Sequence, residues 1–316
     1  MTFLGADLGG TKLAVAAFTD DGEIISRENI PIVGRRGAEV GSLIAERLVR
    51  LSAEHHCEAA GVCVPGLYRA ARGTVWAPNI PGWDDYPLLD ELRSALGPGV
   101  RVTIDSDRAA YILGETWRGA AQRATDAIFL AIGTGIGAGI LNGGKILRGH
   151  GDVAGAIGWL ALDRPFMPRY VQHGCLEDQA SGPGLVRMAQ DLIRADSTYH
   201  GGLRKDNLND LDASDVFAAH ERGDMIGVKV IDNAIELWGM TVANLVSLFN
   251  PEIIVFGGGI FGPGAKFLDR ISVEARRWAQ PIAIDQVRLV VTALGSDAGL
   301  FGAGRLAMTP PEERSA

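Results

Sequence analysis

Two short glycine-rich runs hold the residues whose types and spacing best suit the binding of a polyphosphate. The first run is Asp7-Leu8-Gly9-Gly10-Thr11-Lys12, and the second is Gly133-Thr134-Gly135-Ile136-Gly137-Ala138-Gly139. Because glycine has no Cβ, backbone amides in such turns can converge on an anion. The hydroxyl groups of Thr11 and Thr134 can donate hydrogen bonds to phosphate oxygens. A single run of this kind is more often a tight hairpin, but two together favour one polyphosphate held between two domains.

Two charged residues flank the first run. We expect the carboxylate of Asp7 to orient hydrated Mg²⁺, because this ion keeps most of its waters in proteins and takes few direct ligands. Lys12 is expected to lie near a phosphate. The plain structural alternatives are an Asp that closes the turn and a Lys that points into solvent.

Apolar segments around these runs predict the elements that position them. Strand, glycine turn and strand recur in each half of the chain, which predicts duplicated α/β domains. The first domain is expected over residues 1–118 and the second over 119–298, with a C-terminal helix at 299–316 packed on the first. The predicted strands are 3–7, 13–18, 60–64, 100–105, 127–132, 139–141 and 253–256, and the longer predicted helices are 40–53, 108–119 and 225–249.

Composition excludes several classes of protein. A formal net charge of −8 argues against a nucleic-acid surface, where a basic stripe is expected. No apolar run approaches the ~20 residues that span a bilayer, and no signal-peptide pattern opens the chain. The three cysteines, Cys57, Cys63 and Cys175, are too scattered for a disulfide framework. We therefore expect a cytoplasmic protein without nucleic-acid or membrane partners.

In their order along the chain, these segments resemble the ROK group of sugar kinases and sugar-responsive repressors, within the sugar kinase and actin-like ATPase superfamily. The resemblance covers nearly the whole chain. Further matching segments are Val64-Pro65-Gly66, residues 78–83, residues 174–177, residues 251–259 and residues 299–303. The resemblance implies two duplicated actin-like (ribonuclease H-like) α/β domains with a cleft between them. It also implies an ATP-dependent sugar kinase that uses Mg²⁺ and forms a homodimer.

Residue roles follow from the same resemblance. The nucleotide would be bound by Asp7, Gly9, Gly10, Thr11, Lys12, Gly133, Thr134, Gly135, Gly257, Gly258 and Gly259. Asp107 would be the catalytic base, because it precedes Leu113-Gly114-Glu115 with the spacing of the group. Phosphoryl transfer needs a carboxylate there to accept one proton, although residues 105–107 could equally cap the following helix. The sugar pocket would contain Gly66, Asn79, Asp105, Ser106, Asp107, Ala156, Trp159 and Glu177.

The chain departs from the group's pattern in three places. Ser106 stands where Asn is usual, while Ala156 and Trp159 replace the Glu and His that bind hydroxyl groups on the anomeric side of the sugar. Trp159 could also be a plain core residue. That His and three Cys ordinarily bind a structural zinc, but only Cys175 of the set is present. One thiolate cannot form a tetrahedral site, so we expect no zinc.

We expect phosphorylation of a hexose or hexose derivative at the 6-hydroxyl, as in glucokinases. One alternative is an amino sugar such as glucosamine, N-acetylglucosamine or 3-amino-3-deoxyglucose, because Asp105 adds a carboxylate near the pocket. Another is a sugar-sensing regulator without catalysis. The related repressors usually carry a helix-turn-helix module before the first phosphate loop, where this chain has six residues, so direct DNA binding is not expected.

Overall fold

A computed structural model describes residues 1–309, which divide into two compact units. Unit 1 comprises Met1–Ala127, Gly139–Gly155 and the chain from Thr292 onward, and unit 2 comprises Ile128–Ala138 and Ala156–Val291. The expected C-terminal helix is α11 (Ala298–Met308), which packs on the strands of unit 1. Its predicted continuation over 310–316 lies outside the described residues.

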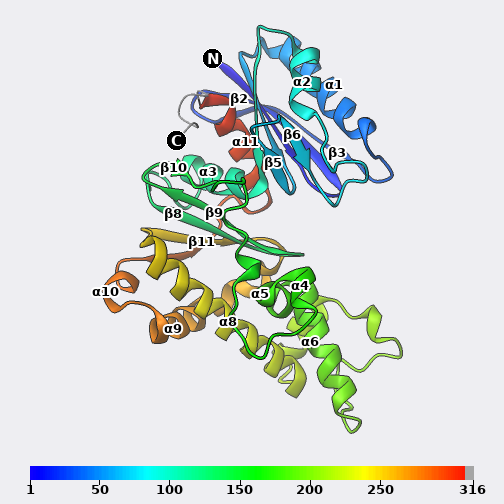
Figure 1. The fold of residues 1–316 in the computed structure, drawn as a ribbon, viewed down its shortest axis with the longest axis vertical. Helices are drawn as coiled ribbons and strands as arrows, with labels where there is room; N and C mark the ends of the chain where they lie inside the picture. The colour runs from blue at the N-terminus through cyan, green and yellow to red at the C-terminus, as the bar shows by residue number, and fades with distance from the viewer. Residues whose placement is uncertain (310–316) are drawn as a thin grey trace. The chain divides into compact units, whose positions relative to one another are not determined.

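The first sheet has five strands in the order β3-β2-β1-β4-β7 (Figure 1). These are β1 (Thr2–Leu8), β2 (Lys12–Thr19), β3 (Ile24–Pro31), β4 (Ala59–Val64) and β7 (Arg101–Ser106). Strand β1 pairs antiparallel with β2 and parallel with β4, which in turn pairs parallel with β7. The carboxyl ends of β1, β4 and β7 therefore lie at one edge of the sheet, where ligands gather in open α/β folds.

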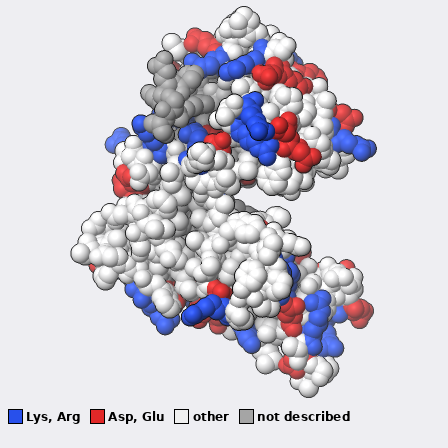
Figure 2. Space-filling model, viewed as in Figure 1, with Lys and Arg blue, Asp and Glu red and all other residues white. Residues whose placement is uncertain are grey.

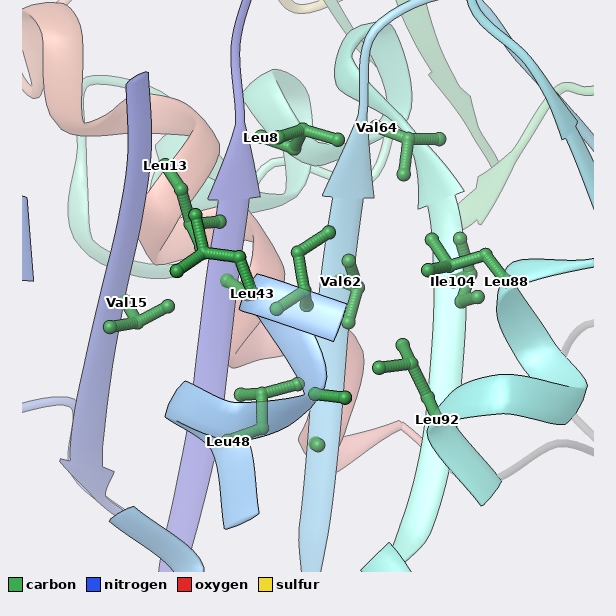
Figure 3. Close-up of a cluster of buried hydrophobic side chains, with 14 of the residues drawn as sticks. Leu8, Leu13, Val15, Leu43, Leu48, Val62, Val64, Leu88, Leu92 and Ile104 are labelled. Atoms are coloured by element: carbon green, nitrogen blue, oxygen red, sulfur yellow. The ribbon is translucent and has the colours of Figure 1, made fainter. Parts of the chain in front are cut away.

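Helices cover both faces of this sheet. On one face, α1 (Ala38–His55) and α2 (Leu88–Leu96) place leucines against alternating strand residues, as Figure 3 shows for Leu48, Leu92 and Val62. On the other face lie α3 (Asp107–Arg118) and α11. A Cβ added at Gly61 of β4 would lie 1.9 Å from the Ala303 carbonyl oxygen, so only glycine permits α11 to approach so closely.

The second sheet repeats this pattern, with the order β10-β9-β8-β11-β12. Its strands are β8 (Ala127–Ile132), β9 (Ile136–Asn142), β10 (Lys145–Ile146), β11 (Ile253–Gly257) and β12 (Arg288–Val291). Three consecutive strands occupy one side of each sheet, and two later strands extend it on the other side. The predicted duplication of an α/β fold is confirmed.

The remaining elements complete the two units. A two-stranded sheet, β5 (Leu67–Arg69) with β6 (Thr74–Trp76), belongs to unit 1. The helices of unit 2 are α4 (Tyr170–His173), α5 (Cys175–Ala180), α6 (Gly182–Ala195), α7 (Ala213–Glu221), α8 (Met225–Phe249), α9 (Leu268–Trp278) and α10 (Pro281–Ile284). Trp238 of α8 is fully buried, and its indole N–H donates to the Ala180 carbonyl at 3.1 Å.

One boundary differs from its prediction by more than two residues. The strand expected at 139–141 begins at Ile136, so Gly137 and Gly139 belong to β9 and the second glycine turn is only Gly133-Thr134-Gly135. Gly139 is needed inside the strand, because a Cβ there would lie 1.9 Å from the Arg108 carbonyl oxygen. A glycine-rich sequence alone does not separate a turn from such close packing.

Two surface properties bear on partners. Among residues 1–309, no helix is long and apolar enough to cross a membrane. On the face shown in Figure 2, Lys and Arg side chains are interspersed with Asp and Glu side chains. This mixture gives that face no extended basic stripe of the kind that binds nucleic acid.

Candidate active site

The first glycine turn joins β1 to β2 in unit 1. Its Gly9 N–H donates to the Lys12 carbonyl at 2.9 Å, which closes the turn, while Gly10, Thr11 and Lys12 are exposed. Asn79 belongs to the same region, since a Cβ built on Gly10 would lie 3.8 Å from the Asn79 Cβ. The structure thus brings Asn79 beside the first predicted phosphate turn.

Asp7 lies near the end of β1 on the face covered by α11. A Cβ at Gly299, in the first turn of α11, would lie 2.5 Å from the Asp7 Oδ2, so only glycine leaves room for this carboxylate. Burial raises the pKa of Asp7, whereas a hydrogen bond with the Cys63 thiol and the charge of Lys12 lower it. A helix N-terminus favours a negative charge at this place.

Asp107 is the first residue of α3 and directly follows β7. The cap of this helix is Ser106, whose Oγ accepts from the Ala109 N–H at 3.4 Å. Burial raises the pKa of Asp107 to about 6, with the charge of Arg108 opposing the shift. A half-buried carboxylate of this pKa is suited to accept a proton near neutral pH.

Asp105 has a partner that the sequence did not reveal. Its Oδ2 lies 2.5 Å from Nη2 and 3.2 Å from Nε of Arg148, and its side chain is only 8% exposed. An amino group on the sugar would need a free carboxylate at this position, whereas the Asp105 carboxylate is neutralised by Arg148. A nearly buried Asp requires a cation, but the sequence does not say which arginine supplies it.

Gly66 follows β4 and has a φ of +97°. A Cβ at this position would lie 2.3 Å from the Trp76 carbonyl oxygen. The residue therefore has a structural reason to be glycine, in addition to its predicted place in the sugar pocket.

In unit 2, the second and third glycine turns lie together. Gly133 donates to the Gly135 carbonyl at 2.9 Å and accepts from the Gly182 N–H at 2.8 Å. A Cβ on Gly133 would lie 3.5 Å from the Gly259 nitrogen, and one on Gly258 would lie 2.4 Å from the Ile132 carbonyl oxygen. Thr134 remains exposed beside the third turn, 257–259.

Glu177 of α5 contacts the residue that follows the second turn. Its Oε2 accepts from the Ile136 N–H at 2.7 Å. Burial raises the pKa of Glu177, and this hydrogen bond lowers it. Gly158 adjoins the same carboxylate, because a Cβ there would lie 2.9 Å from Oε2.

Ala156 precedes the short 3₁₀ segment η1 (Ile157–Trp159), which contains Gly158 and ends at Trp159. The Trp159 side chain is 55% exposed, so it does not pack in the core of unit 2. Ala156 is half-buried. An exposed indole offers a flat apolar surface and one N–H donor.

Contacts with other side chains of unit 2 hold the segment 168–175, where the resembled group usually has zinc ligands. The Gln179 amide donates to the Tyr170 hydroxyl at 3.1 Å and lies 3.7 Å from the Cys175 Sγ. The fully buried Asp178 carboxylate contacts Arg169 at 2.6 Å and Arg187 at 3.1 Å. These side chains fix the segment that precedes and includes Glu177.

We therefore expect the purified protein to contain no stoichiometric zinc. Chelation should leave its fold and activity intact once Mg²⁺ is restored for the nucleotide, because the group's ligands are absent at Trp159, Pro168 and Tyr170. Elemental analysis of protein expressed with added zinc is the measurement. One zinc per chain would show this expectation to be wrong.

Comparisons with known proteins identify the family of the chain and support its fold. The sequence model described as the ROK family matches residues 3–309. The glucokinase of Halalkalibacterium halodurans is 33% identical over 313 residues, which cover 96% of this chain and 94% of that protein. A ROK hexokinase from Thermus thermophilus shares 31% identity and superposes with a TM-score of 0.80 over 98% of each chain. A ROK family glucokinase from Streptomyces griseus, solved with glucose and AMPPNP, shares 30% identity with a TM-score of 0.75 over 98% of this chain and 99% of that one.

Proposed function

Because the chain belongs to the ROK family, we propose that it is an ATP-dependent kinase that phosphorylates a hexose or hexose derivative at the primary 6-hydroxyl group. The observation that most directly supports the chemistry is Asp107, a half-buried carboxylate with a pKa of about 6, placed at the end of β7. The supporting relatives are the glucokinases and the ROK hexokinase described above.

In the proposed reaction, the sugar hydroxyl oxygen forms a bond with the γ-phosphorus of ATP, and the bond to the bridging oxygen breaks to release ADP. Asp107 accepts the hydroxyl proton. The catalysed step otherwise needs alignment and charge neutralisation. Thr11 and Thr134 donate to phosphate oxygens, and Lys12 adds a positive charge on the exposed first turn.

A magnesium ion fits this site through its water shell. When bound with the nucleotide, Mg²⁺ supplies charge neutralisation on the phosphates. Asp7 is a single, partly buried carboxylate at the strand end, which suits an acceptor for metal-bound water better than a complete set of direct ligands. The backbone of residues 257–259 would adjoin the adenosine.

Asn79 and Gly66 of unit 1 are proposed as sugar-binding residues, and Glu177 of unit 2 is proposed separately as a sugar-binding residue. Ser106 caps α3 through its oxygen and keeps its hydroxyl hydrogen for a sugar oxygen. Asp105 contributes through Arg148 in place of a direct contact with the sugar.

We further propose a cytoplasmic homodimer. The buried, unpaired thiols of Cys57, Cys63 and Cys175 support a reducing compartment. The homodimer is carried over from the family, and light scattering after gel filtration tests it.

A coupled ADP-release screen tests the proposed function. The panel is glucose, mannose, glucosamine, N-acetylglucosamine and 3-amino-3-deoxyglucose. We expect turnover that depends on a hexose, with the amino sugars poorer because Arg148 neutralises Asp105. Faster turnover of an amino sugar would support the alternative substrate, whereas sugar binding by calorimetry without any ADP release would support a non-catalytic sensor.

Specificity is expected to depend on Ala156 and Trp159. Restoring both polar residues in the double variant Ala156→Glu/Trp159→His should raise kcat/KM for glucose relative to the native substrate. Each new hydrogen bond to a buried hydroxyl is worth about 0.5–1.5 kcal/mol, so the ratio should change roughly tenfold. The single variants are expected to do less, since the two residues lie close together in the sequence around Gly158 and we expect their effects to be coupled. An unchanged ratio in a well-folded double variant would rule out this role.

A further inference from the structure

Asp105 and Arg108, which lie on either side of the proposed base in the sequence, are both bound to the loop that follows β10. Asp105 pairs with Arg148, and the Arg108 Nη1 donates to the Ala154 carbonyl at 3.3 Å. Within the loop, the Ala154 N–H donates to the Arg148 carbonyl at 3.0 Å. These contacts form a closed ring that includes Asp107 and lies wholly within unit 1.

Asp105 is also fixed on its other side. Its Oδ1 accepts from the Ser106 N–H at 2.8 Å, so both carboxylate oxygens are committed at the junction of β7 and α3. The nearly buried Asp105 carboxylate depends on the Arg148 guanidinium, which is itself only 25% exposed. A two-nitrogen contact of this kind defines orientation as well as charge.

We propose that Arg148 is a positioning residue for phosphoryl transfer, which fixes the β7–α3 junction and thereby the Asp107 carboxylate through its ion pair with Asp105. This inference rests on the proposed function of Asp107. Arg148 acts in two separable ways. The contacts of its two guanidinium nitrogens with Asp105 orient the junction that carries Asp107, and its positive charge neutralises the Asp105 carboxylate, two residues before Asp107.

The charge effect has a predictable sign. The titratable groups beside Asp107 are Asp7 of β1, Cys63 of β4, and Arg108 and Tyr111 of α3. The variant Arg148→Met leaves the Asp105 anion unpaired, and this second negative charge raises the pKa of Asp107 further. The variant Asp105→Asn leaves the Arg148 cation instead and lowers it.

The experiment measures the pH profile of kcat/KM for these two variants and for their combination. We expect the acid limb to move up by at least about 0.5 pH unit in Arg148→Met, to move down in Asp105→Asn, and to return near the wild-type position in the double variant. In Arg148→Lys the acid limb of the pH profile should not move, because the positive charge is kept. The value of kcat should fall about tenfold or more, because lysine cannot replace the two nitrogen contacts of the guanidinium group. The matched control is Arg50→Met, which removes an ion pair between Arg50 of α1 and Glu28 of β3 in the same unit.

The titration of ¹³C-labelled aspartate carboxyl groups, with Asp107→Asn to assign the signal, reads the same shifts without catalysis. This readout separates failure of the inference from failure of the proposed function. Single variants that move the limb in the same direction, or not at all, would overturn the proposal. If Arg148→Met does not fold, the comparison of Arg148→Lys with Asp105→Asn decides it, and an unchanged kcat in Arg148→Lys contradicts the positioning role.

Discussion

Replacement of Asp107 by Asn is expected to lower kcat by ~10²–10⁴-fold while nucleotide affinity stays nearly unchanged. The substitution preserves shape, and its carbonyl oxygen can still accept the Arg108 N–H that Asp107 Oδ1 accepts at 2.8 Å. Only the proton acceptor is lost. Steady-state kinetics with saturating ATP and calorimetric titration with AMPPNP measure the two quantities. Retention of more than about half of the wild-type kcat would reject Asp107 as the base.

The same variant should be more stable than the wild type above pH 6. Because the folded-state pKa of Asp107 is raised to about 6, its stabilising contribution is present below the unfolded pKa and is lost as the pH rises through 6. Asn cannot ionise and avoids this loss, on the order of 1 kcal/mol or more. Thermal unfolding at pH 4 and pH 8 measures it. An equal change in Tm at both pH values would contradict the assigned pKa.

Replacement of Gly139 by Ala is expected to reduce both stability and turnover. The added Cβ would lie 1.9 Å from the carbonyl oxygen of Arg108, in the first turn of α3 beside Asp107, so the strand or the helix must shift. Overpacking of this kind costs about 1–3 kcal/mol. A displacement of the base by about 1 Å can cost up to 10²-fold in rate. Chemical denaturation and kcat are the measurements.

The control for this variant is Gly99→Ala in the same unit. A Cβ at Gly99 has no neighbour within 4 Å, so its effect should stay within about 0.5 kcal/mol. If Gly139→Ala were as stable and as active as Gly99→Ala, the close approach of β9 to α3 would not be required for function.

The sequence predicted those parts of the fold that depend on local pattern. The helix expected at 225–249 begins and ends at the residues where α8 does, because its apolar periodicity and its Asp224 cap are both local signals. The repeated strand, turn and strand predicted the two sheets. The close contact of Gly139 was not predicted, because it is made with a distant carbonyl group and not with neighbours in the sequence.

In the candidate site, too, the features that depend on local sequence were predicted and those that depend on distant contacts were not. The glycine turns and Asp107 were predicted from short motifs, and their assignments to ligands remain predictions. Arg148 was missed, since nothing near it in sequence marks it as the partner of Asp105, 43 residues earlier. Likewise, sequence does not tell whether a tryptophan after a glycine turn is buried, and Trp159 is exposed. Such properties depend on which segments meet in the folded chain.

The most direct test is the product formed from ATP, Mg²⁺ and glucose, followed by ³¹P NMR with wild-type protein and with Asp107→Asn. We expect the wild type to convert the γ-phosphate signal into a hexose 6-phosphate signal in step with ADP, and the variant to form it at least about a hundred times more slowly. Release of inorganic phosphate without a sugar phosphate, or equal product from both proteins, would contradict a hexose kinase that uses Asp107 as its base.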